Sequence, residues 1–350
     1  MIYRKKMIVM AALLSFSAAA APGVDLVANE TPIHTVKSAE AVAKIPAGFR
    51  LVEPGTLTVA ISLLGSGPPF GLYARDNKTV IGSEADIARL VADGLGLKLK
   101  LVPTSWEDWP LGVASGKYDA AVYNITVTNE RKTKFDFATY RQDTLGFYVK
   151  SDSKITQINT APDIAGKKII VDSGTNQEAV LLAWDKENRA KGLAPLQPVY
   201  VTDKAASTLA IQSGRADATF GPNVSGAYQA RLTGKTRLVG IVPGGWPKTA
   251  NIAVTLKKGN GLVDAVQASL NSAIANAAIC RCWIAGRRAT RRSPIRRLTR
   301  RGWGIERATG SAQRGLIAAQ SRSVIPPPLS AFPACGTACC AKRRAPWPPG

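Results

Sequence analysis

The sequence predicts an α/β protein, and two kinds of pattern support this prediction. Residues 57–61 are rich in β-branched side chains and residues 97–101 alternate between apolar and polar, as strands do. Between them, Ile87, Leu90 and Val91 recur at helical spacing. Strands that alternate with helices favour sheets flanked by helices.

Residues 115–131 predict a helix end, a buried strand and a polar turn that starts another helix. Residues 119–125 form a short apolar run, and Asn124 and Thr126 place hydrogen-bonding groups at its C-terminal end. Ligands of open α/β sheets bind beyond such strand ends. Arg131 follows, and its planar guanidinium suits a carboxylate. A solvated arginine on a helix surface would fit the same spacing.

The beginning of the chain is typical of an exported protein. Residues 1–21 combine a basic start with an apolar stretch that ends in three alanines, which predicts a cleavable signal peptide. A transmembrane anchor is the alternative, but the apolar stretch is shorter than the roughly 20 residues that a span needs. Residues 22–50 contain proline and glycine with little periodicity, which predicts a linker.

Charge and cysteine are concentrated in the last part of the chain. Residues 278–350 contain 14 Arg and one Lys against Glu306, and therefore +14 of the net charge of +22. All five cysteines lie there too, with no convincing metal-binding spacing. This composition predicts a disordered tail rich in Arg, Pro and Cys.

Two explanations of this tail are open. One is a shift of the reading frame near codon 277, since a GC-rich gene read out of frame gives such a composition. The other is a real basic extension that binds nucleic acid or acidic lipid. The body of the protein has a much smaller positive charge, so no nucleic-acid partner is expected for it.

The motifs of the body resemble those of periplasmic solute-binding proteins of the polar amino acid type, the bacterial extracellular solute-binding proteins of family 3. The similarity is carried by Asn-Ile-Thr-Val-Thr-Asn-Glu-Arg131 followed by Phe-Asp-Phe at 135–137, by Pro69-Phe70, and by Gly166-Lys with Gly174-Thr175. It covers roughly residues 55–277. In the family, helix 262–277 is followed by a Gly-x-Tyr motif and a Trp segment that this chain lacks.

The resemblance implies a two-lobed periplasmic binding protein fold of type II, with each lobe a mixed sheet flanked by helices. Strands near 144–149 and 251–256 would form a two-strand hinge. The first lobe would then be discontinuous, comprising residues 51–150 and 247–277. The second lobe would comprise residues 151–246.

The resemblance also implies a ligand site between the lobes. Arg131 and Thr126 would hold the ligand's carboxylate, and Trp106 would cover the ligand. The second lobe would complete the cage with Gly174 and Thr175, because free amides at a helix N-terminus hold anions. The remaining predicted contacts are Phe70, Asn124, Asn176 and Asn223.

Some of these residues also have purely structural interpretations. Trp106 and Phe70 could belong to the core, and Thr175 could merely cap a helix. Trp109 is expected in the core. Amino acid binders of the family usually carry an Asp where this chain has Pro222, and Asn223 offers only an uncharged acceptor. A carboxylated ligand is therefore expected more firmly than an α-amino acid.

The expected function is that of the substrate-binding component of an ABC importer in the periplasm. It would be a monomer that binds a small carboxylated solute and delivers it to a membrane permease, without metal or cofactor. The body has no Cys, and its one His, His34, lies in the predicted linker, so catalysis by a Ser-His or Cys-His pair is not expected. The alternative is a cyclohexadienyl-type dehydratase of the same fold, with Glu84 or Asp136 as acid or base.

Overall fold

The computed structural model describes residues 30–63, 69–201, 203–276 and 278. The predicted signal peptide, the start of the predicted linker and nearly all of the predicted tail lie outside these residues. Within the described part of the chain, no helix combines the length and the apolar character needed to cross a membrane.

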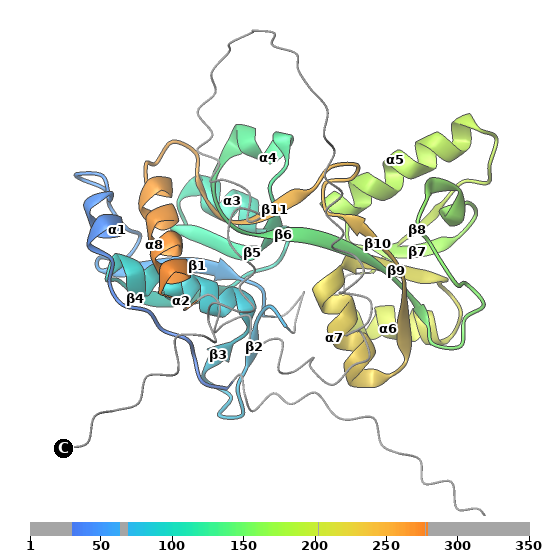
Figure 1. Cartoon of the computed structure of the whole chain (residues 1–350), viewed down its shortest axis with the longest axis horizontal. Coiled ribbons are helices and arrows are strands. Elements are labelled where there is room, and N and C mark those ends of the chain that lie inside the picture. The colour runs from blue at the N-terminus through green and yellow to red at the C-terminus, as the bar shows by residue number, and fades with distance from the viewer. Residues whose placement is uncertain (1–29, 64–68, 202, 277, 279–350) are drawn as a thin grey trace, which may run out of the picture.

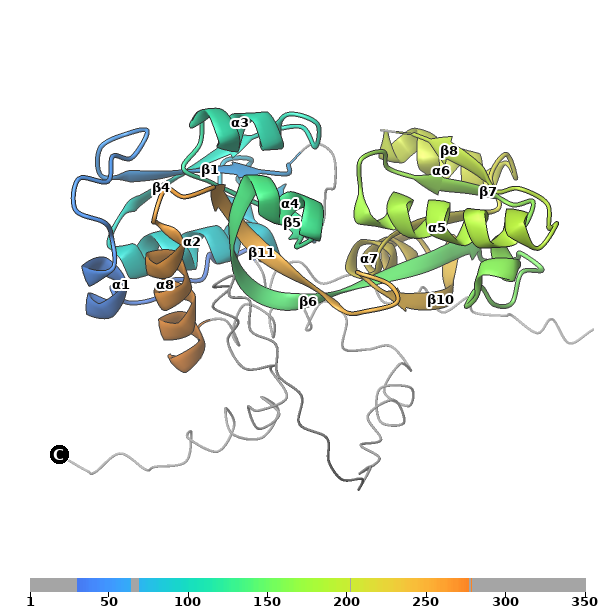
Figure 2. The same cartoon turned by 90° about the horizontal axis from the view of Figure 1, so that it is seen from above.

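The described elements form two groups joined by the long strand β6 and by the connection from β10 to β11 (Figures 1 and 2). The first group comprises α1 (Ala39–Ala43), β1 (Thr56–Ile61), β2 (Leu72–Tyr73), β3 (Val80–Ile81), α2 (Ser83–Leu95), β4 (Lys98–Pro103), α3 (Trp109–Ser115), β5 (Ala120–Thr126), α4 (Asn129–Lys134), β11 (Ala250–Lys257) and α8 (Val263–Ala275). The second group comprises the 3₁₀ helix η2 (Ala161–Ile164), β7 (Lys168–Val171), α5 (Asn176–Ala190), β8 (Gln197–Tyr200), α6 (Lys204–Gln212), β9 (Ala218–Pro222), α7 (Asn223–Thr233) and β10 (Thr236–Pro243).

Strand β6 (Phe135–Lys150) belongs to both groups. The sheet order is β4-β1-β5-β11-β6-β9-β7-β8, with β10 also paired to β6. The first half of β6 pairs with β11, and its second half pairs with β9 and β10. Strands β1, β4 and β5 run parallel to one another, whereas β11 is antiparallel to β5 and β6. The predicted α/β class with mixed sheets is thus confirmed.

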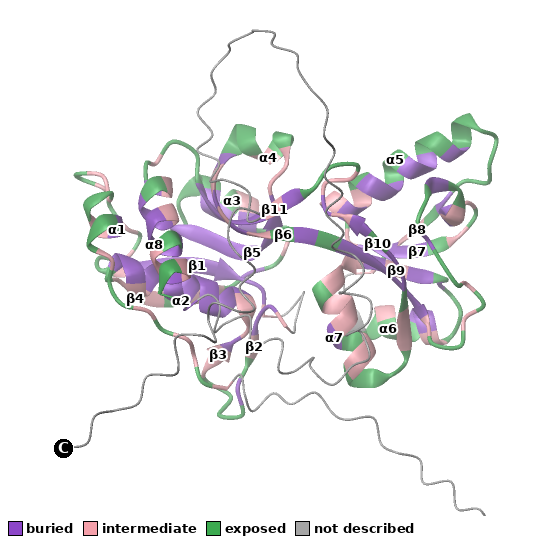
Figure 3. Cartoon of the chain, in the orientation of Figure 1, coloured by how far each residue is buried: buried purple, intermediate pink, exposed green. Residues whose placement is uncertain are grey.

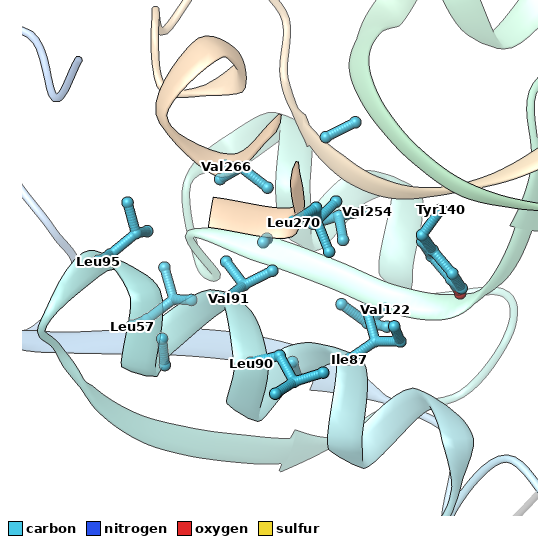
Figure 4. Close-up of a cluster of buried hydrophobic side chains, with 14 of the residues drawn as sticks. Leu57, Ile87, Leu90, Val91, Leu95, Val122, Tyr140, Val254, Val266 and Leu270 are labelled. Carbon is cyan, nitrogen blue, oxygen red and sulfur yellow. The ribbon is translucent and has the colours of Figure 1, made fainter. Parts of the chain in front are cut away.

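Each group has its own apolar core. In the first, residues of α2 pack against strands β1, β5 and β11 and against α8, as the labelled side chains in Figure 4 show. In the second, Phe147, Phe220 and Trp184 stack between β6, β9 and α5. Strand β5 is buried along its whole length (Figure 3), as its apolar run predicts.

Residues 30–50, expected as part of a linker, pack against the first core instead. They include helix α1, where the Ser38 hydroxyl accepts a hydrogen bond from Ala41 N at 3.3 Å and Ala41 is completely buried. His34 contacts Asp93 of α2 at 2.8 Å. The apolar residues of this segment show no clear period in the sequence, but Ala41, Ile45 and Phe49 pack against the core that α2 and α8 help to form.

Ala278 lies in the predicted tail, but its side chain is completely buried in this first core.

Candidate functional site

Arg131 lies at the start of α4, directly after the buried strand β5. Thr128 caps this helix by accepting a hydrogen bond from Arg131 N at 3.1 Å, which turns the chain back over the strand end. The guanidinium donates to the Thr126 carbonyl oxygen at 2.9 Å and to the Gly174 carbonyl oxygen, in the second group of elements, at 3.2 Å. Its Cζ lies 5.2 Å from the centroid of the Trp106 ring. Arg131 is therefore held between the lobes and is not a freely solvated arginine.

Desolvation lowers the pKa of the Arg131 guanidinium, since the charged form has lost part of its water, while the charge of Glu130 acts in the opposite direction. An arginine stays charged in either case. The site thus holds a positive charge whose present partners are two neutral carbonyl groups. A carboxylate would be a stronger partner, because hydrogen bonds between charged groups are shorter and stronger than neutral ones.

A cavity of about 330 Å³ lies between the two groups of elements. The part of the chain that the structure describes contributes residues from both sides. The lining residues are Phe70, Thr104, Ser105, Trp106, Glu107, Tyr123, Asn124, Asp172, Ser173, Thr175, Asn176, Gln177, Tyr200, Val201, Pro222 and Ser225. Five of the nine predicted ligand contacts are among them: Phe70, Trp106, Asn124, Thr175 and Asn176.

The aromatic side chains at the cavity divide into core and lining. Trp109 is 1% exposed and packs on Phe135 with ring centroids 5.2 Å apart, which confirms it as a core residue. Trp106 is half-buried, contacts Trp109 and Tyr123 edge-on, and lines the cavity. Phe70 is 1% exposed, as a core residue is, and it also lines the cavity, so its contact with a ligand stays a prediction.

Thr126 and Asn124 already have partners within the protein. The Thr126 hydroxyl donates to Asp143 Oδ2 at 2.9 Å, and it is the Thr126 backbone carbonyl that holds Arg131. Asn124 has a φ of +54°, a conformation that asparagine tolerates better than most residues. Its backbone N–H donates to Glu84 at 2.9 Å and its side-chain oxygen accepts from Arg141.

The loop before α5 is also internally bonded. Gly174 has a φ of +68°, and its N–H donates to Glu178 Oε2 at 2.7 Å. Thr175 caps α5 by accepting from Glu178 N at 3.2 Å. Asn176 Nδ2 donates to Gly244 O at 2.7 Å and lies 3.4 Å from Asp143 Oδ2. A bound carboxylate would therefore compete with Glu178 for the Gly174 amide.

The start of α7 differs from the expectation for Asn223. The Asn223 side-chain oxygen accepts from the Tyr148 hydroxyl at 2.7 Å, and Asn223 is not among the residues that line the cavity. Pro222 and Ser225 line it instead. The Ser225 Oγ is buried and has no hydrogen-bond partner among the described residues. No sequence pattern indicates Ser225, because its position depends on where α7 begins.

A buried charge cluster contacts Asn124 and Phe70, two of the residues that line the cavity. Glu84 is completely buried, accepts hydrogen bonds from Asn124 N and the Tyr140 hydroxyl, and lies 3.6 Å from the Arg141 guanidinium. Burial raises the pKa of the Asp143 carboxyl, and the nearby Arg141 reduces that rise. For Arg141, burial alone would lower the pKa, but Glu84, Tyr140 and Asp143 together raise it.

The two residues considered as acid or base for a dehydratase are not at the cavity. Glu84 is enclosed in the cluster just described. Asp136 accepts from Gly259 N at 2.8 Å and pairs with Lys258 at 2.9 Å. Neither lines the cavity. Among the described residues, no group of three or more His, Cys, Asp or Glu side chains could hold a metal ion.

The comparisons with known proteins identify the family. The chain belongs to the bacterial extracellular solute-binding proteins of family 3, whose model matches residues 59–285. It is 35% identical over 140 residues to the L-cystine-binding protein TcyJ of Escherichia coli (strain K12), a match that covers 40% of this chain and 50% of that protein. The chain thus spans about half the length of the TcyJ proteins that it matches.

Two further comparisons bear on fold and function. Cyclohexadienyl dehydratase of Pseudomonas aeruginosa is 28% identical over 185 residues, which cover 52% of this chain and 65% of that enzyme. The solved structure of an ancestral arginine-binding protein bound to arginine matches with a TM-score of 0.58 and 23% identity, and covers 66% of this chain and 97% of that one. This likeness confirms the predicted two-lobed fold.

Proposed function

We propose that this chain is the substrate-binding component of an ABC importer, and that it binds a small carboxylated, amino-acid-like solute in the cavity between its lobes. The solute is then delivered to a membrane permease. The chain acts in the periplasm as a monomer, after removal of a signal peptide. Membership of family 3 and the names of its relatives, which are binding proteins for amino acids, support this proposal.

The observation that carries the proposal is the position of Arg131. Its guanidinium contacts backbone carbonyls of both lobes and stacks on Trp106, which lines the cavity. A ligand carboxylate would replace neutral acceptors with a charged one that matches the fork of the guanidinium. Because Gly174 of the second lobe is one of those acceptors, ligand binding and the relative position of the lobes are coupled.

The test is a series of thermal melts of the purified chain with single amino acids, 2-oxo acids and related carboxylates. A ligand that binds only the folded state raises its stability by about 2.7 kcal/mol at a concentration 100 times the Kd. Arg131→Ala and Arg131→Lys are then compared with Lys132→Ala, an exposed change on the same helix. Arg131→Ala should weaken binding by about 2–5 kcal/mol, since it leaves the carboxylate unpaired. Unchanged affinity in both Arg131 variants contradicts the proposal.

A dehydratase remains the second candidate, because the enzyme from Pseudomonas aeruginosa is a relative and the cavity contains two carboxylates, Glu107 and Asp172. Incubation of the chain with arogenate or prephenate distinguishes the two. Product formation would show an enzyme, and a melt shifted by a ligand without any turnover would show a receptor.

A further inference from the structure

The charged residues of the cavity are both acidic. Among the described lining residues, Glu107 and Asp172 carry carboxylates and none is Lys, Arg or His. Glu107 lies in the turn between β4 and α3, and Asp172 lies in the loop between β7 and α5. One therefore comes from each lobe. Burial raises the pKa of the Tyr123 hydroxyl, and the negative charges of Glu107 and Asp172 add to that rise, so both lie near this ring.

The rest of the lining also suits a cation. Four of the lining residues are aromatic, and the faces of aromatic rings attract cations: Phe70, Trp106, Tyr123 and Tyr200. Arg131, which is not among the lining residues, already makes this kind of contact with Trp106.

An independent observation indicates that the cavity is built for a polar ligand. The Ser225 Oγ lines it, is buried, and has no hydrogen-bond partner among the described residues. A buried hydroxyl without a partner costs free energy, which a ligand group at this place would recover. Pro222, one turn earlier at the same wall, offers no side-chain acceptor for an ammonium.

We propose that Glu107 and Asp172 together recognise a cationic group, an ammonium or a guanidinium, of the same ligand whose carboxylate binds Arg131. This inference rests on the proposed function and narrows its ligand class to carboxylates that also carry a positive charge. The acids stand in for the acidic residue absent at position 222. Serine at 225 then contributes a neutral hydrogen bond beside them.

Because Glu107 and Asp172 lie on different lobes, a bound cation would also affect closure of the lobes. Two like charges that approach each other across the cleft repel, and the repulsion grows as water leaves. A cation bound between Glu107 and Asp172 is attracted to both carboxylates and offsets the repulsion between them. The closed form is therefore favoured by a cationic ligand and disfavoured by an anionic one that lacks the positive group.

Matched pairs of probes test this assignment by isothermal titration with the full chain. Each amino acid is compared with the 2-oxo acid that has a carbonyl oxygen in place of its ammonium. L-Arginine is compared with the 2-oxo acid of L-citrulline, which carries neither an ammonium nor a guanidinium. The variants are Glu107→Gln, Asp172→Asn and the double variant, with the exposed change Glu187→Gln on α5 as the control.

The wild-type chain should bind the cationic member of a pair more tightly than its neutral partner. Asp172→Asn should reduce that preference roughly tenfold, as expected for loss of a hydrogen bond to a charged group, and Glu107→Gln, which is more exposed, several-fold. The neutral partners should be unaffected, and Glu187→Gln should behave as wild type.

Two results would overturn the inference in different ways. If the neutral members bind as well as the cationic ones, or the preference survives in the double variant, the acids do not recognise a cation although the chain is a receptor. If no probe binds the wild-type chain, or Arg131→Ala leaves the affinity of every probe unchanged, the proposed function itself fails and the inference with it.

Discussion

Replacement of Glu84 should destabilise the first lobe more than most single changes. Glu84 is completely buried at the start of α2 and connects three elements: it accepts from Asn124 N of β5 and from the Tyr140 hydroxyl of β6, and it lies 3.6 Å from the Arg141 guanidinium. In Glu84→Ala, Arg141 keeps its charge but loses this partner inside the protein. Removing one partner of a buried ion pair lowers the free energy of unfolding by about 3–5 kcal/mol.

Glu84→Gln removes the negative charge but keeps the size of the side chain, so it distinguishes the effect of the charge from that of packing. The amide can still accept from Asn124 N, so the loss is limited to the charged part of the network, about 1.5–3 kcal/mol. For a two-lobed body of this size, a loss of about 3–5 kcal/mol in the alanine variant corresponds to a fall in Tm of roughly 6–20 °C.

Urea unfolding followed by circular dichroism measures these differences, with Glu187→Gln as the exposed control. Hydrogen exchange adds a local readout, because the Asn124 amide that Glu84 holds should exchange faster in both variants. A loss below about 1 kcal/mol in Glu84→Ala would refute the reasoning, since it would show that the cluster is solvated or rearranges freely.

Two further changes test other parts of the structure. Asp143→Asn should alter the pH profile of stability. Burial raises the pKa of Asp143, so the folded chain binds this proton more tightly than the unfolded chain does. The stability of the wild type relative to the variant should therefore fall as the pH rises from the ordinary pKa of Asp through the raised pKa. Urea unfolding at several pH values measures this, and a difference that does not vary with pH contradicts it. Gly94→Ala should cost about 1–3 kcal/mol, because the added methyl would lie 2.1 Å from Ser269 Oγ at the contact between α2 and α8. A Tm equal to wild type would show that α8 can shift, and Ser269→Gly in the same chain should recover part of the loss.

The parts of the fold that depend on local pattern were predictable. Residues 57–61, 97–101 and 119–125 coincide closely with β1, β4 and β5, because each run is apolar or alternates as a strand does. Strand β6 was recognised only over 144–149. Its first half contains charged residues such as Arg141, and their partners come from distant segments of the chain.

The start of α2 also depends on a contact that the local sequence does not predict. The sequence suggests a capping box, in which the Ser83 side chain caps the helix and the Asp86 side chain accepts a hydrogen bond from the Ser83 backbone N–H. In the structure Gly82 is the N-cap with a φ of +117°, and Asp86 pairs with Arg89 at 2.7 Å. A Cβ at Gly82 would lie 2.5 Å from Phe70 O, so the close approach of residues 69–70 favours glycine at this cap.

Within the candidate site, the preceding strand end indicated Arg131, and the family resemblance indicated Trp106. Neither indicated that the Thr126 hydroxyl is taken by Asp143 or that Asn223 turns to Tyr148. Both depend on β6, which brings Asp143 and Tyr148 next to residues far away in the chain. Glu107 and Asp172 were detectable in principle, since each lies within two residues of a predicted contact.

The register of β6 with β11 indicates where whole domains could be exchanged or inserted in this chain. Asp143 and Ala250 are direct antiparallel partners, so the chain leaves the first lobe and returns to it at adjacent points of one ladder. The entire second lobe therefore occupies the position of a hairpin loop. A gene that encodes a short turn in its place would still join the two strands in register, and other domains could be inserted at the same junction without disturbing the first sheet.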